Sequence, residues 1–517
     1  MKKEAENFLN QSSKKEAAKV EAEDKKLETG FSHIIEAEQK FGLDPFATQF
    51  ELVPPRIMYQ MAAYGGLPDR RPHWTSGRDF WQMRTSYEYG LSKIYELIIN
   101  SDPSLILMAD TNPPIENIVT MAHARSGHSD FFKRNYLFKE TSRDMPDIAS
   151  LHARRIRDYE FREGVIPVEK ILDAALAIEE HIDPRRLDRP SRDKEITLWR
   201  KGWRQKTEKS PTELPMKMPP SPDKDLLGII RNHAPYLEDW ERDTVDIVRT
   251  ESHYFYPQYR TKIMNEGWAS YWHMKILEEM YAKDQITPAE MEHVNIMNAG
   301  VLQKNPKGIN PYRFGVMMFQ YIEEYYNGNL TDKETRWLKN NDYPVYPKYE
   351  GKFEDSPGLK KIFEVAENND DQSLIFNYFN KITADRMNMY IYEEMEFANG
   401  SITVIKDKGW MEIRDKMVES KTNCGNPYIV CTDIDYKQNT ELYLKHQYEG
   451  QELEAPYVEK TLPYIYSLWR KPVHLETVTE SGGKTVFTFD GKATKRVQET
   501  PPPKPTTKPP GYPYGHP

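Results

Sequence analysis

Two stretches of this sequence carry residue types that do chemistry, and one of them is TKIMNEGWASYWH, residues 261–273. It sets a carboxylate, Glu266, and an imidazole, His273, among bulky aromatic side chains. On a helix that turns about 100° per residue, positions seven apart lie roughly 20° from each other, so these two side chains share one face. Such a pair can bind a metal ion, or act as a base with its orienting partner. A buried hydrogen bond between packed aromatic helices is the alternative, and both interpretations stay open.

Gly267 lies inside the same stretch. Glycine in a helix interior costs about 1 kcal/mol relative to alanine. Its presence therefore predicts that another backbone approaches this helix closely.

The second stretch is MAHARSGHSDFFKRN, residues 121–135, which holds His123 and His128. Residues five apart lie about 140° from each other on an ideal α-helix, whereas the i, i+4 pair of HExxH places both imidazoles on one face. Gly127 could distort the helix and bring the two rings together, or His128 could begin a new segment. The spacing alone is weak evidence for a metal site, and two unrelated histidines are the alternative. The candidate metal ligands are His123, His128, Glu266 and His273.

Glu251 is a candidate general base, together with Glu266. Pro257 is expected to end or kink the helix that carries Glu251, because proline cannot continue the hydrogen-bond ladder. Glu251 would then face Glu266 across a turn, although an ion pair with an arginine is the alternative. We expect His253 to be exposed and His73, beside a tryptophan, to serve packing.

Composition and motifs exclude several classes of protein. The chain has 517 residues and a net charge of −9, which argues against general nucleic-acid binding. The sequence contains no GxxxxGK[ST], GxGxxG, GxSxG or HExxH motif. Cys424 and Cys431 match no common zinc spacing and suggest a reducing compartment. With no signal peptide and no apolar run of membrane-spanning length, we expect a cytoplasmic protein.

The hydrophobic pattern divides the chain into four segments: a charged arm (1–30), a mainly helical domain (31–398), an α+β domain (399–495) and a proline-rich disordered tail (496–517). The charged arm is either a solvated helix or disordered. Apolar spacing predicts helices at 86–100, 167–182, 226–249 and 314–326. Thr287, Pro288 and Glu290 form a helix-start signal with a capping box.

The C-terminal part alternates between strand and helix patterns. Strands are predicted at 401–405, 427–435 and 441–448, helices at 410–420 and 456–469, and a hairpin at 473–491 that turns at 481–483. The fold class is therefore α+β: a large mainly α-helical domain followed by a small α+β domain of order βαββαββ.

Five blocks of the sequence resemble the SpoVR family, named for stage V sporulation protein R. They are HWTSGRDFW, YEYGLSKIYELIIN, AHARSGHSDFFKRN, TKIMNEGWASYWH and LYLKHQYEGQELEAPYVEKTLPYIYSLWRKPVHLET. The similarity covers most of residues 31–478. The charged arm and the proline-rich tail fall outside it.

The resemblance implies a bacterial cytoplasmic protein that, in spore formers, is linked to formation of the spore cortex, a peptidoglycan layer. It also implies protein partners, because relatives are often encoded near a PrkA-type serine kinase and a YhbH-like protein. A regulatory or interaction protein in cell-wall assembly is one hypothesis. The alternative is a metal-dependent hydrolase using zinc, iron or manganese, and whether the protein is an enzyme stays open. No family histidine is expected at His253.

Overall fold

The computed structural model describes residues 2–88, 94–207, 218–305, 308–397, 400–407 and 409–498. Of the tail predicted over 496–517, residues 496–498 lie in the last strand, and the rest, from residue 499 onward, lies outside the described residues. The chain forms two compact units, each built from two segments: residues 1–155 with 254–425, and residues 156–253 with 426–517. The division into four segments, which was predicted from the hydrophobic pattern, stays a prediction.

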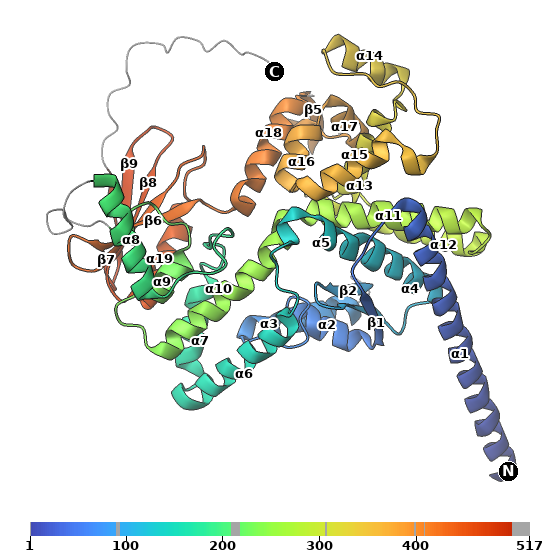
Figure 1. The fold of residues 1–517 in the computed structure, drawn as a ribbon, viewed down its shortest axis with the longest axis horizontal. Coiled ribbons are helices and arrows are strands. Elements are labelled where there is room, and N and C mark those ends of the chain that lie inside the picture. Colours follow the sequence, from blue (N-terminus) through green and yellow to red (C-terminus); the bar gives the residue numbers. More distant parts are fainter. Residues whose placement is uncertain are drawn as a thin grey trace. The chain divides into compact units, whose positions relative to one another are not determined.

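The first unit is organised around helix α11 (Lys262–Ala282) (Figure 1). Its two tryptophans, Trp268 and Trp272, are completely buried, because they pack edge to face against each other and also pack against the phenylalanines of neighbouring helices. Helix α13 (Pro311–Tyr326) and the segment η1 (Ala122–Ser129) both pack on α11. The helix expected at 261–273 is thereby confirmed, and its aromatic side chains face the core of the unit.

The remaining helices of this unit surround that centre. They include α1 (Lys2–Phe41), α2 (Pro55–Ala63), α3 (Trp74–Glu88), α4 (Pro114–Met121), α5 (Asp130–Arg134), α12 (Pro288–Val301), α14 (Asp332–Asn340), α15 (Pro357–Asn368), α16 (Asp371–Tyr378), α17 (Lys381–Met387) and α18 (Trp410–Lys421). Helix α6 (Met145–Glu163) begins in this unit. The predicted start of α12 is confirmed: Thr287 is the N-cap, and Glu290 closes a capping box.

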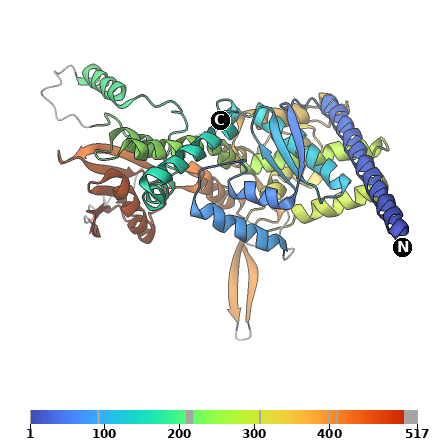
Figure 2. The ribbon, with the colours of Figure 1, turned by 90° about the horizontal axis from the view of Figure 1, so that it is seen from below.

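A small sheet in the first unit was not predicted. Its order is β1-β3-β2, with β1 (Thr48–Val53) parallel and β2 (Glu96–Ile99) antiparallel to β3 (Ser104–Ala109) (Figure 2). The prediction of a helix over 86–100 is wrong at residues 96–99, which form the strand β2. The apolar run Leu97–Ile99 fits strand and helix patterns equally, and pairing with β3 decides between them.

The second unit carries the five-stranded sheet of order β10-β9-β8-β7-β6. The strands are β6 (Ile429–Tyr436), β7 (Glu441–His446), β8 (Val473–Val478), β9 (Lys484–Phe489) and β10 (Thr494–Gln498). Only the β7–β8 pair is parallel, and helix α19 (Ala455–Trp469) connects these two strands.

The predicted fold class, α+β with the order βαββαββ, is confirmed by β5, α18, β6, β7, α19, β8 and β9. The first of these strands does not join the sheet. Instead β5 (Gly400–Asp407) pairs with β4 (Ile391–Phe397) in a separate hairpin. The turn predicted at 481–483 joins β8 to β9, and Gly482 there has a φ of +80°.

Helices α7 (Val165–Leu176), α8 (Arg192–Thr207) and α9 (Leu226–His233) complete the second unit with most of α10 (Asp239–Arg260). The single helix predicted over 226–249 is two helices. The break is at Ala234, whose ψ of 126° is the extended conformation that a following proline imposes. Pro257 does not end its helix, since α10 continues to Arg260.

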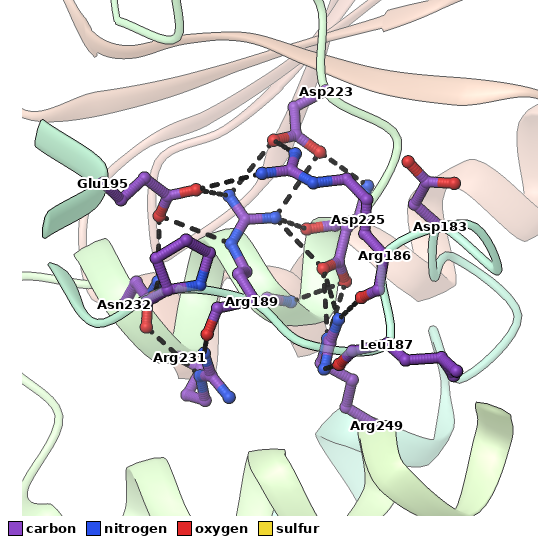
Figure 3. Close-up of polar contacts among 12 residues, drawn as sticks. Asp183, Arg186, Leu187, Arg189, Glu195, Asp223, Asp225, Arg231, Asn232 and Arg249 are labelled. Carbon is purple, nitrogen blue, oxygen red and sulfur yellow. Dashed lines mark hydrogen bonds and ion pairs between the residues drawn. The ribbon is translucent and has the colours of Figure 1, made fainter. Parts of the chain in front are cut away.

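A buried ion network lies in the second unit (Figure 3). The Arg189 guanidinium contacts Glu195, Asp223 and Asp225 at 2.8 to 3.1 Å, and its side chain is fully buried. Arg249 forms a second ion pair with Asp225 at 3.0 Å. The Asp223 backbone exchanges two hydrogen bonds with Cys431 of β6, so the network ties α8 and α10 to the edge of the sheet.

Candidate metal centre

The two histidines of the 121–135 stretch lie on η1, which is a π-helix. A π-helix bonds residue i to residue i+5, so residues five apart lie about one turn apart instead of on different faces. The rings of His123 and His128 accordingly meet edge to face, with centroids 4.7 Å apart. The 140° separation calculated for an α-helix therefore does not apply here.

Glycine positions let η1 and α11 approach each other. A Cβ on Gly127 would lie 2.3 Å from the Ala269 Cα, so no other residue fits there without moving α11. On the opposite side, a Cβ on Gly267 would lie 2.4 Å from the Gly315 Cα of α13. The close backbone approach predicted at Gly267 is confirmed.

Three side chains from two elements converge at this point. Glu96 of β2 directs Oε1 to 3.3 Å from His123 Nε2 and 3.7 Å from His128 Nε2. One ligand atom from each of these residues lies within 4.8 Å of the other two. Glutamate oxygen and imidazole nitrogen are ordinary ligands of zinc, iron and manganese.

Glu266 of α11 adds a fourth donor to the same cluster. Its Oε2 lies 3.8 Å from His123 Nε2 and 3.6 Å from His128 Nε2. Four ligands placed about 2.0–2.2 Å from a tetrahedral zinc ion are roughly 3.3–3.6 Å from one another. The observed separations are close to that spacing, so an ion would fit with small side-chain movements.

The cluster is almost closed to water, since the four side chains are only 7 to 17 % exposed. Within the part of the chain that the structure describes, Glu266 Oε2 has no hydrogen-bond partner. A buried carboxylate oxygen without a partner is unfavourable, and an ion is one of the few explanations. This orphaned oxygen is the strongest indication that the cluster holds a ligand.

The other ring nitrogens of the histidines have partners. His128 Nδ1 donates to Asn265 Oδ1 at 2.9 Å. His123 Nδ1 lies 2.9 Å from His273 Nδ1, and His273 Nε2 donates to Asn298 Oδ1 at 2.9 Å. Both ring nitrogens of His273 are thus engaged behind His123, whereas the Nε2 atoms of His123 and His128 face the carboxylates.

Burial and mutual charge shift the pKa values of the cluster. Burial raises the pKa of Glu96 to about 7, against the effect of His123. Burial, helped by the neighbouring His123, lowers the pKa of His128 to about 4. Burial raises the pKa of Glu266, but the imidazoles of His123 and His128 outweigh it and lower the value overall. His128 is therefore neutral near pH 7, as a histidine ligand must be, and Glu266 is ionised. Against the effect of burial, the Glu96 and Glu266 carboxylates raise the pKa of His123, so metal binding at His123 competes with a proton.

Not all of the residues expected at a site lie here. Glu251 is fully buried on α10 in the second unit and is not part of the cluster; its role as a general base stays a prediction. His253 is buried, so the expectation that it is exposed is wrong. His73 Nδ1 bonds to Thr75 Oγ1, which fits the expected packing role.

Glu96 is the residue that sequence reasoning missed. It stands in a segment assigned to a helix, where nothing distinguishes it from other glutamates. The available signal was its place directly before the apolar run Leu97–Ile99, in one of the blocks that resemble the SpoVR family.

The protein is thus of the α+β class. A mainly helical region, which holds a buried carboxylate–imidazole cluster, is followed by an α+β region. The family model described as "SpoVR like protein" matches residues 21–426, and that described as "SpoVR-like C-terminal domain" matches residues 427–480. Because these matches span most of the chain, it belongs to the SpoVR-like family.

A particular relative is the "Uncharacterized protein YcgB" of Escherichia coli (strain K12). It is 28 % identical over 486 residues, which cover 88 % of this chain and 92 % of the relative. No solved structure matches the chain. Among the described residues, no helix is both long and apolar enough to cross a membrane.

Proposed function

We propose that the first unit binds one divalent metal ion through Glu96, His123 and His128, and that the protein is a metal-dependent hydrolase. The observation that supports this most directly is the buried Glu266 Oε2, which has no hydrogen-bond partner among the described residues and lies 3.8 and 3.6 Å from the Nε2 atoms of His123 and His128. Two histidines and one glutamate are the ligand set of several zinc peptidases.

Glu266 is the proposed general base. When bound, the ion would lower the pKa of a coordinated water toward 7. Glu266 lies next to His123 and His128 and would act as the general base, accepting a proton from the water that attacks an amide or ester carbonyl. It would then give this proton to the departing amine or alcohol, which regenerates the carboxylate.

Tyr312 of α13 belongs to the surroundings of this base. Its ring stacks on His123 with centroids 6.2 Å apart, and its hydroxyl lies near the Glu266 carboxylate. Burial, together with the Glu266 and Glu96 carboxylates, raises the pKa of Tyr312 well above its ordinary value. The hydroxyl therefore keeps its proton and orients the Glu266 carboxylate.

Elemental analysis by mass spectrometry tests the metal centre. Untagged protein purified without chelator should contain about one zinc, iron or manganese ion per chain. His128→Ala should lose it, because a ligand is gone. His293→Ala is the matched control, since His293 lies on α12 and pairs with Glu116 outside the cluster. Metal-free wild-type protein, or equal metal in all three proteins, would overturn the proposal.

The catalytic part needs a separate test. Glu266→Gln keeps the size and one oxygen of the side chain, so it should retain metal but lose hydrolysis of amide and ester substrates. Full hydrolysis by this variant would refute the role of Glu266 as the base.

A second candidate is a regulatory or interaction function in cell-wall assembly, and family membership supports it. Under this proposal the protein acts in the cytoplasm, and in spore formers it contributes to cortex formation. Its partners would be a PrkA-type kinase and a YhbH-like protein. Deleting the α+β region would dismantle the second unit, so exposed residues of α19 are better tests. Tyr457 is 67 % exposed, and Tyr457→Ala should reduce co-purification of a kinase partner. Unchanged co-purification would argue against docking at α19.

A further inference from the structure

His273 was expected to be a metal ligand, but its contacts indicate another role. It stands behind His123, with Nδ1 directed at His123 Nδ1 and Nε2 at the Asn298 side chain of α12. The three side chains form a chain of hydrogen bonds that runs from α12 through α11 to η1.

The chemistry of the end group sets the direction of every bond in this chain. The Asn298 Oδ1 atom can only accept, so His273 Nε2 carries a hydrogen. A neutral imidazole has one N–H, so His273 Nδ1 must accept the bond from His123. His123 then carries a hydrogen on Nδ1, and in its neutral form, the form that binds a metal ion, the Nε2 lone pair faces Glu96 and Glu266.

The burial of His273 stabilises this direction of the hydrogen bonds. It is only 5 % exposed, so water does not compete for its ring nitrogens. His128 also carries its hydrogen on Nδ1, because this atom donates directly to Asn265 Oδ1. Two different arrangements of groups thus leave both Nε2 atoms ready to coordinate at the same point.

We propose that His273 and Asn298 are positioning residues, which hold His123 in the tautomer that binds the metal ion. The inference rests on the proposed metal centre and reassigns His273 from a ligand to an orienting partner. Groups that bond to the far nitrogen of a histidine ligand typically change metal affinity by roughly 10- to 100-fold.

Titration of the full-length, metal-stripped protein with Co²⁺ and Zn²⁺ tests this role. Asn298→Ala should bind both ions roughly 10- to 100-fold more weakly, because His273 loses the partner that fixes its hydrogen. Asn298→Asp keeps the acceptor and should restore the affinity. Asn295→Ala, on the exposed face of the same helix, is the matched control and should bind like the wild type.

Substitutions of His273 separate the two roles. His273→Gln retains an oxygen that accepts from His123 Nδ1, so it should keep most of the affinity and the visible Co²⁺ absorption bands. His273→Leu provides no acceptor and should bind weakly. Circular dichroism of the metal-free variants shows whether each one is folded.

The possible failures are distinguishable. Loss of Co²⁺ binding in a folded His273→Gln variant, with altered bands at high Co²⁺, would make His273 a ligand. Wild-type affinity in Asn298→Ala would overturn the positioning chain and leave the metal centre intact. A wild-type protein that binds neither ion would overturn both the chain and the centre.

Discussion

Gly127 of the π-helix packs closely against the backbone of Ala269 in α11: a Cβ on Gly127 would lie 2.3 Å from the Ala269 Cα. This contact places His123 and His128, on either side of Gly127, against the helix that carries Glu266. The geometry of the candidate site thus depends on a residue that has no functional group.

Gly127→Ala should therefore disturb both stability and the site. Overpacking of this kind typically costs about 1–3 kcal/mol, and the displaced η1 should bind metal more weakly. Denaturant unfolding and Zn²⁺ titration measure the two effects. Gly300→Ala on α12 is the control: nothing lies within 4 Å of its added Cβ, so it should be neutral or up to about 1 kcal/mol more stable. Equal stability of both variants would contradict the proposed packing role of Gly127.

The sequence predicted the chemistry of this site better than its geometry. Glu266 and His273 share a face because α11 is a regular helix, and this followed directly from their spacing. The meeting of His123 and His128 could not be derived, since the angle between residues five apart depends on whether the helix is α or π. Gly127 of the π-helix packs against Ala269, a residue more than 130 positions away, and local sequence patterns do not show such a contact.

Glu96 shows a different limit of the sequence. The short apolar run Leu97–Ile99, which follows Glu96, suits either a strand or a helix, and only its pairing with β3 makes it a strand. The C-terminal region was more predictable because most of its strands and helices are marked by local alternation and by turn residues; strand β10 was not predicted. The β4–β5 pairing, by contrast, is a relation between strands that local patterns do not define.

The buried ion network of the second unit predicts a strong and asymmetric response to mutation. Arg189 is fully buried among three carboxylates, so Arg189→Met should cost about 3–5 kcal/mol because it removes the buried cation that all three share. Arg186 contacts Asp223 and Glu195 from a half-exposed position, and Arg186→Met should cost less than about 1 kcal/mol. Thermal unfolding compares them, and similar losses for both would argue against burial as the source of the effect.

Because His253 is buried, we expect the second unit to lose stability in mild acid. Burial, with the nearby Arg249, lowers its pKa to about 4, against the effects of Asp225 and Asp246. Neither of its ring nitrogens has a hydrogen-bond partner among the described residues. An unfolded histidine has a pKa near 6.5, so between about pH 6.5 and 4 the unfolded chain binds the extra proton. Stability should be constant above that window and fall as the pH decreases through it.

Substitution of His253 checks this origin of the acid sensitivity. In His253→Gln, the decrease in unfolding temperature between pH 6.5 and 4 should be smaller than in the wild type. His181→Gln should act in the same direction, because burial and Lys224 lower the pKa of His181 to about 4. A pH profile identical to that of the wild type in both variants would show that other groups are responsible.

Metal removal should destabilise the first unit, because the proposed ion joins β2 and η1 at a point next to α11. An ion that binds only the folded chain adds about 2.7 kcal/mol of stability when its free concentration is one hundred times its dissociation constant. Chelation of the wild type should therefore lower its unfolding temperature, and added Zn²⁺ should restore it. His128→Ala should respond to neither treatment, whereas His293→Ala, a histidine outside the cluster, should behave like the wild type. A Zn²⁺ response that persists in His128→Ala would mean that the ion stabilises the protein from another place.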